Sequence, residues 1–172
     1  MSKLHLTVGT HDPKIQVHCN RFWPTKVFNL SITPPKVIEE THLRMQEVYH
    51  KDGGPWRRWY MPRTAMIFLD DSENLSREEK NEKAKRKATL AWENYWKAMA
   101  GTIDQSKVDS AVNSTIYGSP EDVADKISTK YHPHDKVMLW FDFNNHDNSD
   151  VKNSMNVFHE KVIPMIEAYG KD

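Results

Sequence analysis

The sequence predicts an α/β fold in which buried parallel strands alternate with helices. Strand-sized apolar runs, such as residues 137–141, are nearly continuous instead of alternating with polar residues, which is typical of parallel strands. Each run is followed, directly or after a loop, by a segment with helical character, so a crossover can return the chain to the same sheet. The pattern recurs along the whole chain, and we expect four βα units.

The first unit begins with residues 4–8, an apolar run that stops at Gly9. Asp12 then supplies an N-cap and Pro13 a first-turn residue for a helix that we expect to reach about Asn20. The sequence therefore predicts a strand, a short turn and a helix.

The second unit begins with residues 27–32, which predict a strand rich in apolar residues. Thr33, Pro34 and Pro35 punctuate its end. A helix is expected next, because apolar residues recur with helical spacing at Val37, Ile38, Leu43, Met45 and Val48.

The third unit follows a loop that starts with two glycines and a proline at residues 53–55. Residues 63–69 predict a strand, and residues 76–100 predict a long helix that ends at Gly101. We expect a loop between Gly101 and Gly118.

The fourth unit is preceded by a helix that opens after Gly118 and runs toward Lys130. Residues 136–143 predict the fourth strand, which is largely apolar. Residues 151–169 predict the final helix.

Four βα units are half of the eight that close a TIM barrel. We therefore expect residues 1–172 to form a single domain, half of a (β/α)8 barrel with four parallel strands and outer helices. The first and last strands would each leave an unpaired hydrogen-bonding edge. We expect these edges to be covered by a second copy in a homodimer or by a complementary N-terminal half-barrel. An open doubly wound sheet with helices on both faces is the alternative architecture.

Composition excludes several function classes. Lys and Arg together number 24, as do Asp and Glu, so the formal net charge is zero and no global positive field attracts nucleic acid or a membrane. The apolar runs are far shorter than the roughly 20 residues of a membrane-spanning helix, and residues 1–10 lack the apolar region of a signal peptide. We expect a cytoplasmic protein. The single cysteine, Cys19, has no cysteine partner for a disulfide or a metal site.

Three sequence blocks carry a resemblance to a known family. They are LTVGTHDP at residues 6–13, YGSPEDVADKI at residues 117–127 and SMNVFHEKVIPMI at residues 154–166. In this order, with the apolar run 137–143 between the second and the third, they resemble the C-terminal half of the luciferase-like flavin monooxygenases, which include the bacterial luciferase subunits.

The resemblance implies a (β/α)8 barrel that binds reduced FMN, or in some branches the deazaflavin F420, and uses O2 to oxidise a small organic substrate. It aligns the start of this chain with the fifth strand of the barrel. The first four strands, which carry much of the flavin and substrate surface in the family, would then be contributed from elsewhere. A flavin reductase is a further partner that the resemblance suggests.

Gly9, Thr10 and His11 are the candidate cofactor-binding residues. Loops that follow the strands form the active face of a TIM barrel, and this turn feeds a helix N-terminus, which favours an anion such as the FMN phosphate. The resemblance places Thr10 at a hydroxyl residue that contacts the phosphate, whereas Pro13 replaces a second hydroxyl residue and Asp12 adds a negative charge. An ordinary strand-to-helix turn is the alternative interpretation.

Asp142 and Asn144 are the candidates for contact with the flavin ring or the substrate. Together with Asn145 and His146 they end the fourth predicted strand, on the same face as the first turn. The alternative is a polar loop without a ligand. The sequence assigns no catalytic residue.

The remaining motifs have structural explanations. Ser119, Pro120 and Asp122 have the pattern of a helix cap, although they invite interpretation as a phosphate loop. The histidines at residues 132–135 lack further ligands at zinc spacing, so we predict no metal site. The basic residues 83–87 are flanked by glutamates, as on a solvated helix. The aromatic residues 56–61 either pack in the core or cover a partner.

Two functions stay open. The first is a luciferase-like flavin-dependent monooxygenase in truncated or half-barrel form. The second is a non-catalytic flavin-binding or oligomerising remnant of that family. FMN binding and substrate-dependent O2 uptake distinguish the two.

Overall fold

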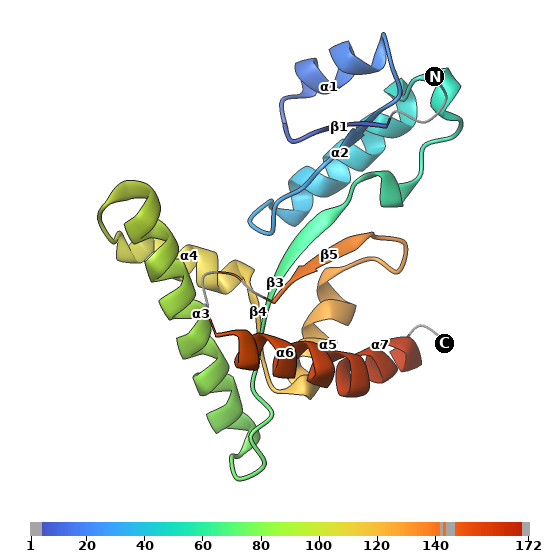
Figure 1. The fold of residues 1–172 in the computed structure, drawn as a ribbon. Helices are drawn as coiled ribbons and strands as arrows, with labels where there is room; N and C mark the ends of the chain where they lie inside the picture. The colour runs from blue at the N-terminus through green and yellow to red at the C-terminus, as the bar shows by residue number, and fades with distance from the viewer. Residues whose placement is uncertain (1–4, 142, 144–146, 170–172) are drawn as a thin grey trace. The chain divides into compact units, whose positions relative to one another are not determined.

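The computed structural model describes residues 5–141, 143 and 147–169 of the chain (Figure 1). The chain forms two compact units. Unit 1 comprises Met1–Thr64 and His134–Met138, and unit 2 comprises Ala65–Pro133 and Leu139–Asp172.

Strands and helices alternate along most of the chain, and the paired strands are parallel. The predicted α/β class with parallel strands is therefore confirmed, with the strands in two small sheets of order β1-β2 and β4-β3-β5. In chain order the elements are β1 (Leu6–Val8), α1 (Pro13–Asn20), β2 (Thr25–Val27), α2 (Pro35–Val48), two 3-10 helices (Lys51–Gly53 and Arg58–Tyr60), β3 (Arg63–Leu69), α3 (Arg77–Ala100), α4 (Gln105–Ser114), β4 (Ile116–Gly118), α5 (Pro120–Lys130), β5 (Val137–Trp140), α6 (Asn148–Val157), a π-helical segment (Phe158–Val162) and α7 (Ile163–Tyr169).

In unit 1, β1 pairs with β2 in the register Leu6 to Thr25 and Val8 to Val27, and α1 and α2 pack together (Figure 1). The core of this unit is apolar and buried. It consists of Val27, Ile38, Met45 and Met61.

Polar groups fix both ends of α1. Asp12 Oδ1 accepts a hydrogen bond from the Lys14 amide at 2.8 Å and Pro13 occupies the first turn, so the predicted helix start is confirmed. At the other end, the buried Asn20 side chain accepts from the Thr25 amide at 3.0 Å and donates to the Thr25 carbonyl oxygen at 3.3 Å. The end of the helix is thereby joined to the first residue of β2.

A buried ion-pair network fixes the later part of unit 1. The Asp135 side chain, 1% exposed, accepts from Arg58 Nε at 2.6 Å and from Arg63 Nη1 at 2.7 Å. Arg58 also binds Glu39 on α2. Because a buried carboxylate is costly without a partner, Asp135 depends on both guanidinium groups.

Unit 2 is built around β3, which is buried at every position. β4 pairs with it in the register Ile67 to Ile116 and Leu69 to Gly118. The helices α3 and α4 supply most of the remaining core, where Trp92 Nε1 donates to Thr115 Oγ1 at 2.9 Å. The main buried cluster comprises Met66, Phe68, Ala88, Ala91, Trp92, Val108, Ala111, Val112 and Phe143.

Local signals at two further helices are confirmed. α3 starts in a capping box formed by Ser76 and Glu79 and ends at Gly101, whose φ of 70° lies in the left-handed region. The Ser119 side chain accepts from the Asp122 amide at the start of α5, so this motif is a helix cap.

The strand pattern differs from the prediction in two places. β2 runs over Thr25–Val27 instead of residues 27–32, because Asn29 makes an isolated parallel bridge to Arg63 and the Thr33 amide closes a turn on the Leu30 carbonyl. The connection expected as a loop contains α4 and β4. The described residues thus hold five short strands instead of four.

The predicted C-terminal helix is also irregular. It begins at Asn148 and widens at Phe158–Val162 into a π-helical turn before α7. Pro164, the second residue of α7, has no amide hydrogen to donate, which accounts for a break in regular α-helical bonding at this point.

Candidate functional site

The turn after β1 and the segment after β2 meet at the carboxyl ends of two paired parallel strands. His11 Nε2 lies 3.2 Å from Thr33 Oγ1, although 22 positions separate the two residues. Thr33 is buried and His11 is half-buried. This edge of a parallel sheet is where ligands bind in α/β proteins.

The contact with Thr33 fits both neutral forms of His11. Nε2 accepts from the Thr33 hydroxyl when the ring proton is on Nδ1, and Nε2 donates to the Thr33 oxygen when the ring proton is on Nε2. Burial lowers the pKa of His11 below its ordinary value of 6.5, so the ring is neutral at pH 7.

His11 Nδ1 is itself buried and has no hydrogen-bond partner in the described structure. A buried polar group without a hydrogen-bond partner costs about 1–3 kcal/mol. The turn therefore presents one ring nitrogen that a ligand would satisfy, and this nitrogen is a donor when it carries the ring proton.

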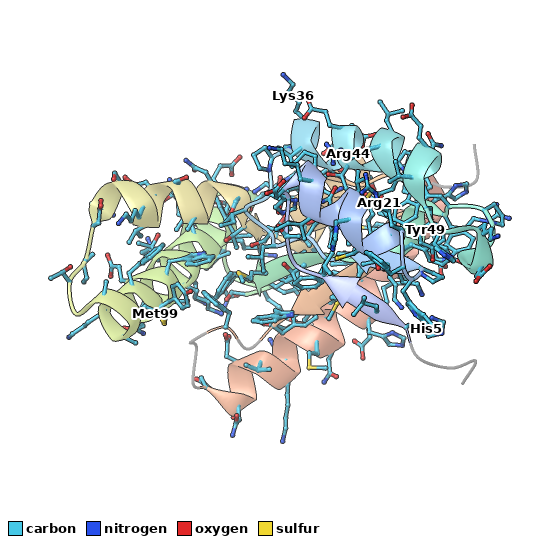
Figure 2. All side chains as sticks on the ribbon, turned by 90° about the horizontal axis from the view of Figure 1, so that it is seen from above. His5, Arg21, Lys36, Arg44, Tyr49 and Met99 are labelled. Carbon is cyan, nitrogen blue, oxygen red and sulfur yellow. The ribbon has the colours of Figure 1, made fainter. Side chains whose placement is uncertain are left out.

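Two hydrogen bonds from residues of the turn and of α1 hold Thr10 in place. Its hydroxyl oxygen accepts from the Asp12 amide at 3.2 Å, and its carbonyl oxygen accepts from Gln16 Nε2 at 2.7 Å. The fully buried Gln16 in turn accepts from Arg44 Nη1 at 2.6 Å. Figure 2 labels Arg44, which reaches this chain of hydrogen bonds from α2.

Gly9 leaves open space at the start of the turn. A Cβ atom added at Gly9 would meet no atom within 4 Å. The predicted residues Gly9, Thr10 and His11 therefore form one turn with room beside it, and Thr33 is the residue of this site that sequence reasoning missed.

Asp12 limits what the helix N-terminus can offer. Its carboxylate already accepts from the Lys14 amide, and Pro13 has no amide hydrogen. The amides of the first turn of α1 are thus largely unavailable to an anion. A ligand at this turn would depend on side chains instead.

Asp142 and Asn144, the candidates for the second part of the site, lie outside the described residues, as do Asn145 and His146. Between them in sequence, Phe143 is buried, with its ring centroid 4.5 Å from that of Trp92.

The remaining motifs have structural roles. Asp135 of the histidine-containing segment is engaged by two arginines, and no group of three or more potential metal ligands occurs in the described part of the chain. Trp56 packs against the core of unit 1, with its Nε1 donating to His42 Nδ1 at 3.0 Å.

No helix in the described ranges combines the length and the hydropathy needed to cross a bilayer.

A charged cluster at the end of β3 was not predicted. The buried Asp70 pairs with Lys83 at 2.9 Å, and Lys87 pairs with Asp150 at 2.5 Å. The basic residues of α3 therefore engage aspartates outside the helix. The signal was present, since Lys83 and Lys87 are four positions apart on one helix face.

No family model matches the chain, and no curated protein matches it. Solved structures do share its fold. The monooxygenase RslO1 from Streptomyces bottropensis is 16% identical over 93% of this chain, with a TM-score of 0.70. The oxygenating constituent of 3,6-diketocamphane monooxygenase from Pseudomonas putida, a type II Baeyer-Villiger monooxygenase in complex with FMN, is 15% identical over 92% of this chain, with a TM-score of 0.56. The chain spans 47% of each of these two chains, and its fold is similar to about half of each.

Proposed function

We propose that this chain is the C-terminal half of a luciferase-like flavin-dependent monooxygenase barrel and that its β1–α1 turn holds the phosphate of FMN. The observation that carries the proposal is the buried His11 Nδ1, which has no hydrogen-bond partner in the described structure and belongs to a turn with open space beside Gly9. The similarity of fold to two monooxygenases, one of them in complex with FMN, supports it.

The side chains of the turn fit a phosphate group. Phosphate oxygens are acceptors, and His11 Nδ1 donates to one of them in the Nδ1-protonated form that this proposal requires. The Thr10 oxygen accepts from the Asp12 amide, so its hydroxyl hydrogen can be donated to a ligand. The phosphate is held mainly by these two side chains, because Asp12 caps the helix N-terminus.

The rest of the flavin would extend toward residues from other loops. We assign Asp142 and Asn144 to contact with the flavin ring or the substrate, as the family resemblance implies. Reduced flavin, when bound, supplies the electrons that activate O2. The protein orients the flavin through the phosphate turn and keeps water away from the ring. A flavin reductase in the cytoplasm would supply the reduced cofactor.

Binding of FMN to the purified chain tests this proposal. We expect FMN to bind more tightly than riboflavin, because riboflavin lacks the phosphate. T10A and H11A should each weaken FMN binding about tenfold and leave riboflavin binding unchanged. H5A is the matched control, since the exposed His5 precedes β1 at the other end of the strand (Figure 2).

Two results would contradict the proposal. One is the absence of FMN binding at tens of micromolar, and the other is equal affinity for FMN and riboflavin. The affinity for F420, which also carries phosphate, is measured in the same way. Comparing it with the affinity for FMN identifies the flavin that the chain prefers.

A non-catalytic flavin-binding protein is the second candidate. It is favoured by one observation, namely that the chain spans only 47% of the two solved monooxygenase chains. Oxygen uptake that depends on NADH, a flavin reductase and an aldehyde or ketone substrate supports the enzyme. Flavin binding without such uptake supports the second candidate.

A further inference from the structure

The β1–α1 turn contributes a negative charge and no positive charge of its own. The carboxylate of Asp12 caps α1, where it accepts from the Lys14 amide at 2.8 Å. His11 is neutral at pH 7, because burial lowers its pKa below 6.5, and Thr10 has no charge. A phosphate monoester carries about 1.5 to 2 negative charges at pH 7. A phosphate at this turn therefore needs a cation from another element.

A buried glutamine connects the turn to such a cation on α2. Gln16 is fully buried in α1, and a buried polar side chain is costly unless it is hydrogen-bonded. Its Nε2 donates to the Thr10 carbonyl oxygen at 2.7 Å, and its Oε1 accepts from Arg44 Nη1 at 2.6 Å. A single amide group thus joins the backbone of Thr10 to the guanidinium group of Arg44.

The chemistry at its two ends fixes the orientation of this amide. A guanidinium group can only donate hydrogen bonds, and a backbone carbonyl can only accept them. Gln16 satisfies both neighbours when its oxygen faces Arg44 and its nitrogen faces Thr10, whereas the reversed amide would satisfy neither. Arg44 is therefore tied to the turn in one defined arrangement.

Arg44 carries a charge that no carboxylate of the described residues neutralises. Its side chain is half-buried, and its hydrogen-bond partner in the described part of the chain is the uncharged Gln16. By contrast, Arg58 and Arg63 of the same unit both pair with Asp135. A guanidinium group has several N–H donors, and the bond to Gln16 uses one of them. Arg44 can therefore still serve an anion.

Lys14 is the nearest alternative cation in sequence, but it lies on the other side of α1. Lys14 and Gln16 are two positions apart, which places their side chains on opposite sides of a helix. Gln16 faces the core, whereas Lys14 is exposed and lines an outer groove together with Arg21. Solvent and salt screen an exposed charge more strongly than a half-buried one. Arg44 is thus the cation that the geometry favours.

We propose that Arg44 supplies the positive charge that retains a terminal phosphate at the β1–α1 turn and that Gln16 holds it in position. Thr10 and His11 donate hydrogen bonds to the phosphate, and Arg44 offsets the combined negative charge of the phosphate and Asp12. The inference rests on the proposed function, in which this turn holds the phosphate of FMN. It makes Arg44 the residue that selects a phosphorylated flavin over an unphosphorylated one.

Titration of the full chain with FMN and with riboflavin, followed by calorimetry, tests the inference. R44Q removes the charge and should weaken FMN binding about tenfold, with riboflavin binding unchanged. R44K keeps the charge and should bind FMN within about threefold of the wild type. Raising NaCl from about 50 to about 500 mM should weaken FMN binding more in the wild type than in R44Q.

The pair of variants separates charge from shape. R44K and R44Q both lose the planar guanidinium group, so a loss of affinity confined to R44Q is an effect of charge. K14Q is the matched control, since it removes one positive charge from the opposite side of α1. Its affinity for FMN should stay within about threefold of the wild type. Urea denaturation checks that each variant is folded.

Three results would overturn the inference. The first is FMN binding by R44Q that equals that of the wild type. The second is an equal loss of affinity in R44K and R44Q, and the third is an equal loss in K14Q and R44Q.

Inorganic phosphate separates this inference from the proposed function. At equal ionic strength, phosphate should raise the melting temperature of the wild-type chain relative to chloride, and R44Q should lose this rise. If the wild type shows the rise without binding FMN, the flavin proposal fails and Arg44 stands as an anion-binding residue. If FMN binds equally to the wild type and R44Q, the flavin proposal stands and the role of Arg44 is refuted. A wild-type chain that responds to neither ligand overturns both.

Discussion

Arg63 Nη1 donates to Asp135 Oδ2 at 2.7 Å, and the Asp135 side chain is only 1% exposed. The pair joins the first residue of β3 to the segment that leads into β5. Asp135 also pairs with Arg58, so its carboxylate is the centre of a network.

Removing the charge of Asp135 should therefore destabilise the chain strongly. We expect D135N to lower the free energy of unfolding by about 3 kcal/mol, because Arg58 and Arg63 would lose the buried carboxylate that both guanidinium groups bind. Urea denaturation followed by circular dichroism measures this. D52N is the control, since the Asp52 side chain is 71% exposed, and should change stability by less than about 0.5 kcal/mol. Equal effects of the two variants would contradict the structural role of Asp135.

Gly118 should be intolerant of a side chain. Its φ of 144° is rarely adopted by other residues, and an added Cβ would lie 2.6 Å from Asn81 Oδ1. Asn81 cannot withdraw freely, because its Oδ1 accepts from the Ser119 amide at 2.8 Å. We expect G118A to cost about 2 kcal/mol or more by thermal or urea denaturation.

G9A is the matched control for G118A. A Cβ at Gly9 would meet no atom within 4 Å, and the φ of Gly9 lies outside the left-handed region. Its effect on the free energy of unfolding should stay within about 0.5 kcal/mol. A larger loss for G9A than for G118A would contradict the backbone geometry described for the two turns.

Acid should lower the stability of unit 2 by protonating the Asp122 carboxylate. Hydrogen bonding to Arg77 is the main cause that lowers the pKa of Asp122 from 3.8 to about 2. Since the pKa is depressed in the folded state, this stabilisation is present above pH 3.8 and is lost as the pH falls toward 2. D122N should remove this pH dependence and cost only about 1 kcal/mol at pH 7, because the Arg77 side chain is half exposed and screened by solvent.

The matched control for D122N is D109N, which changes an exposed aspartate on α4. It should preserve the acid transition of the wild type. If D122N had the same acid transition as the wild type, another carboxylate would be responsible for the loss of stability in acid.

His11 should titrate below its ordinary range. Burial lowers its pKa below 6.5, so protonation is disfavoured in the folded state. The contribution of His11 to stability is therefore complete above pH 6.5 and is lost as the pH falls from 6.5 toward the lower folded pKa. Two-dimensional ¹H–¹⁵N NMR of the ring should show the proton on Nδ1 at pH 7.

T33V tests whether the His11 proton lies on Nδ1, as the phosphate proposal requires, because it removes the hydroxyl that contacts Nε2. We expect the ring to lose its preference for the Nδ1-protonated form. A ring protonated on Nε2 in the wild type would contradict the hydrogen-bond direction on which the phosphate proposal depends.

Short-range chemistry explains which parts of the fold were predicted. Asp12 with Pro13, Ser119 with Pro120 and the Gly101 end of α3 act within a few residues, so their sequence patterns were sufficient. α4 was missed although Asp104 caps it and Val108, Ala111 and Val112 have helical spacing. The three-residue strand β4 is too short to give a pattern of its own and is defined by its pairing with β3.

The candidate site was predictable only in part, for a related reason. Gly9, Thr10 and His11 are consecutive, so a strand-to-helix turn could be predicted from their order. The contact between His11 and Thr33 depends on β1 and β2 being paired in a particular register, which the sequence does not specify. The buried ring nitrogen of His11 that has no partner could be found only in three dimensions.

The boundary between the two units falls inside β3, between Thr64 and Ala65, and again inside β5, between Met138 and Leu139. Neither unit can therefore be produced as a shorter gene product without cutting through a strand, and a protease that nicked β3 would disable both at once. We expect heat or urea to melt the chain in one cooperative step, so the whole sequence is the smallest piece worth expressing or crystallising.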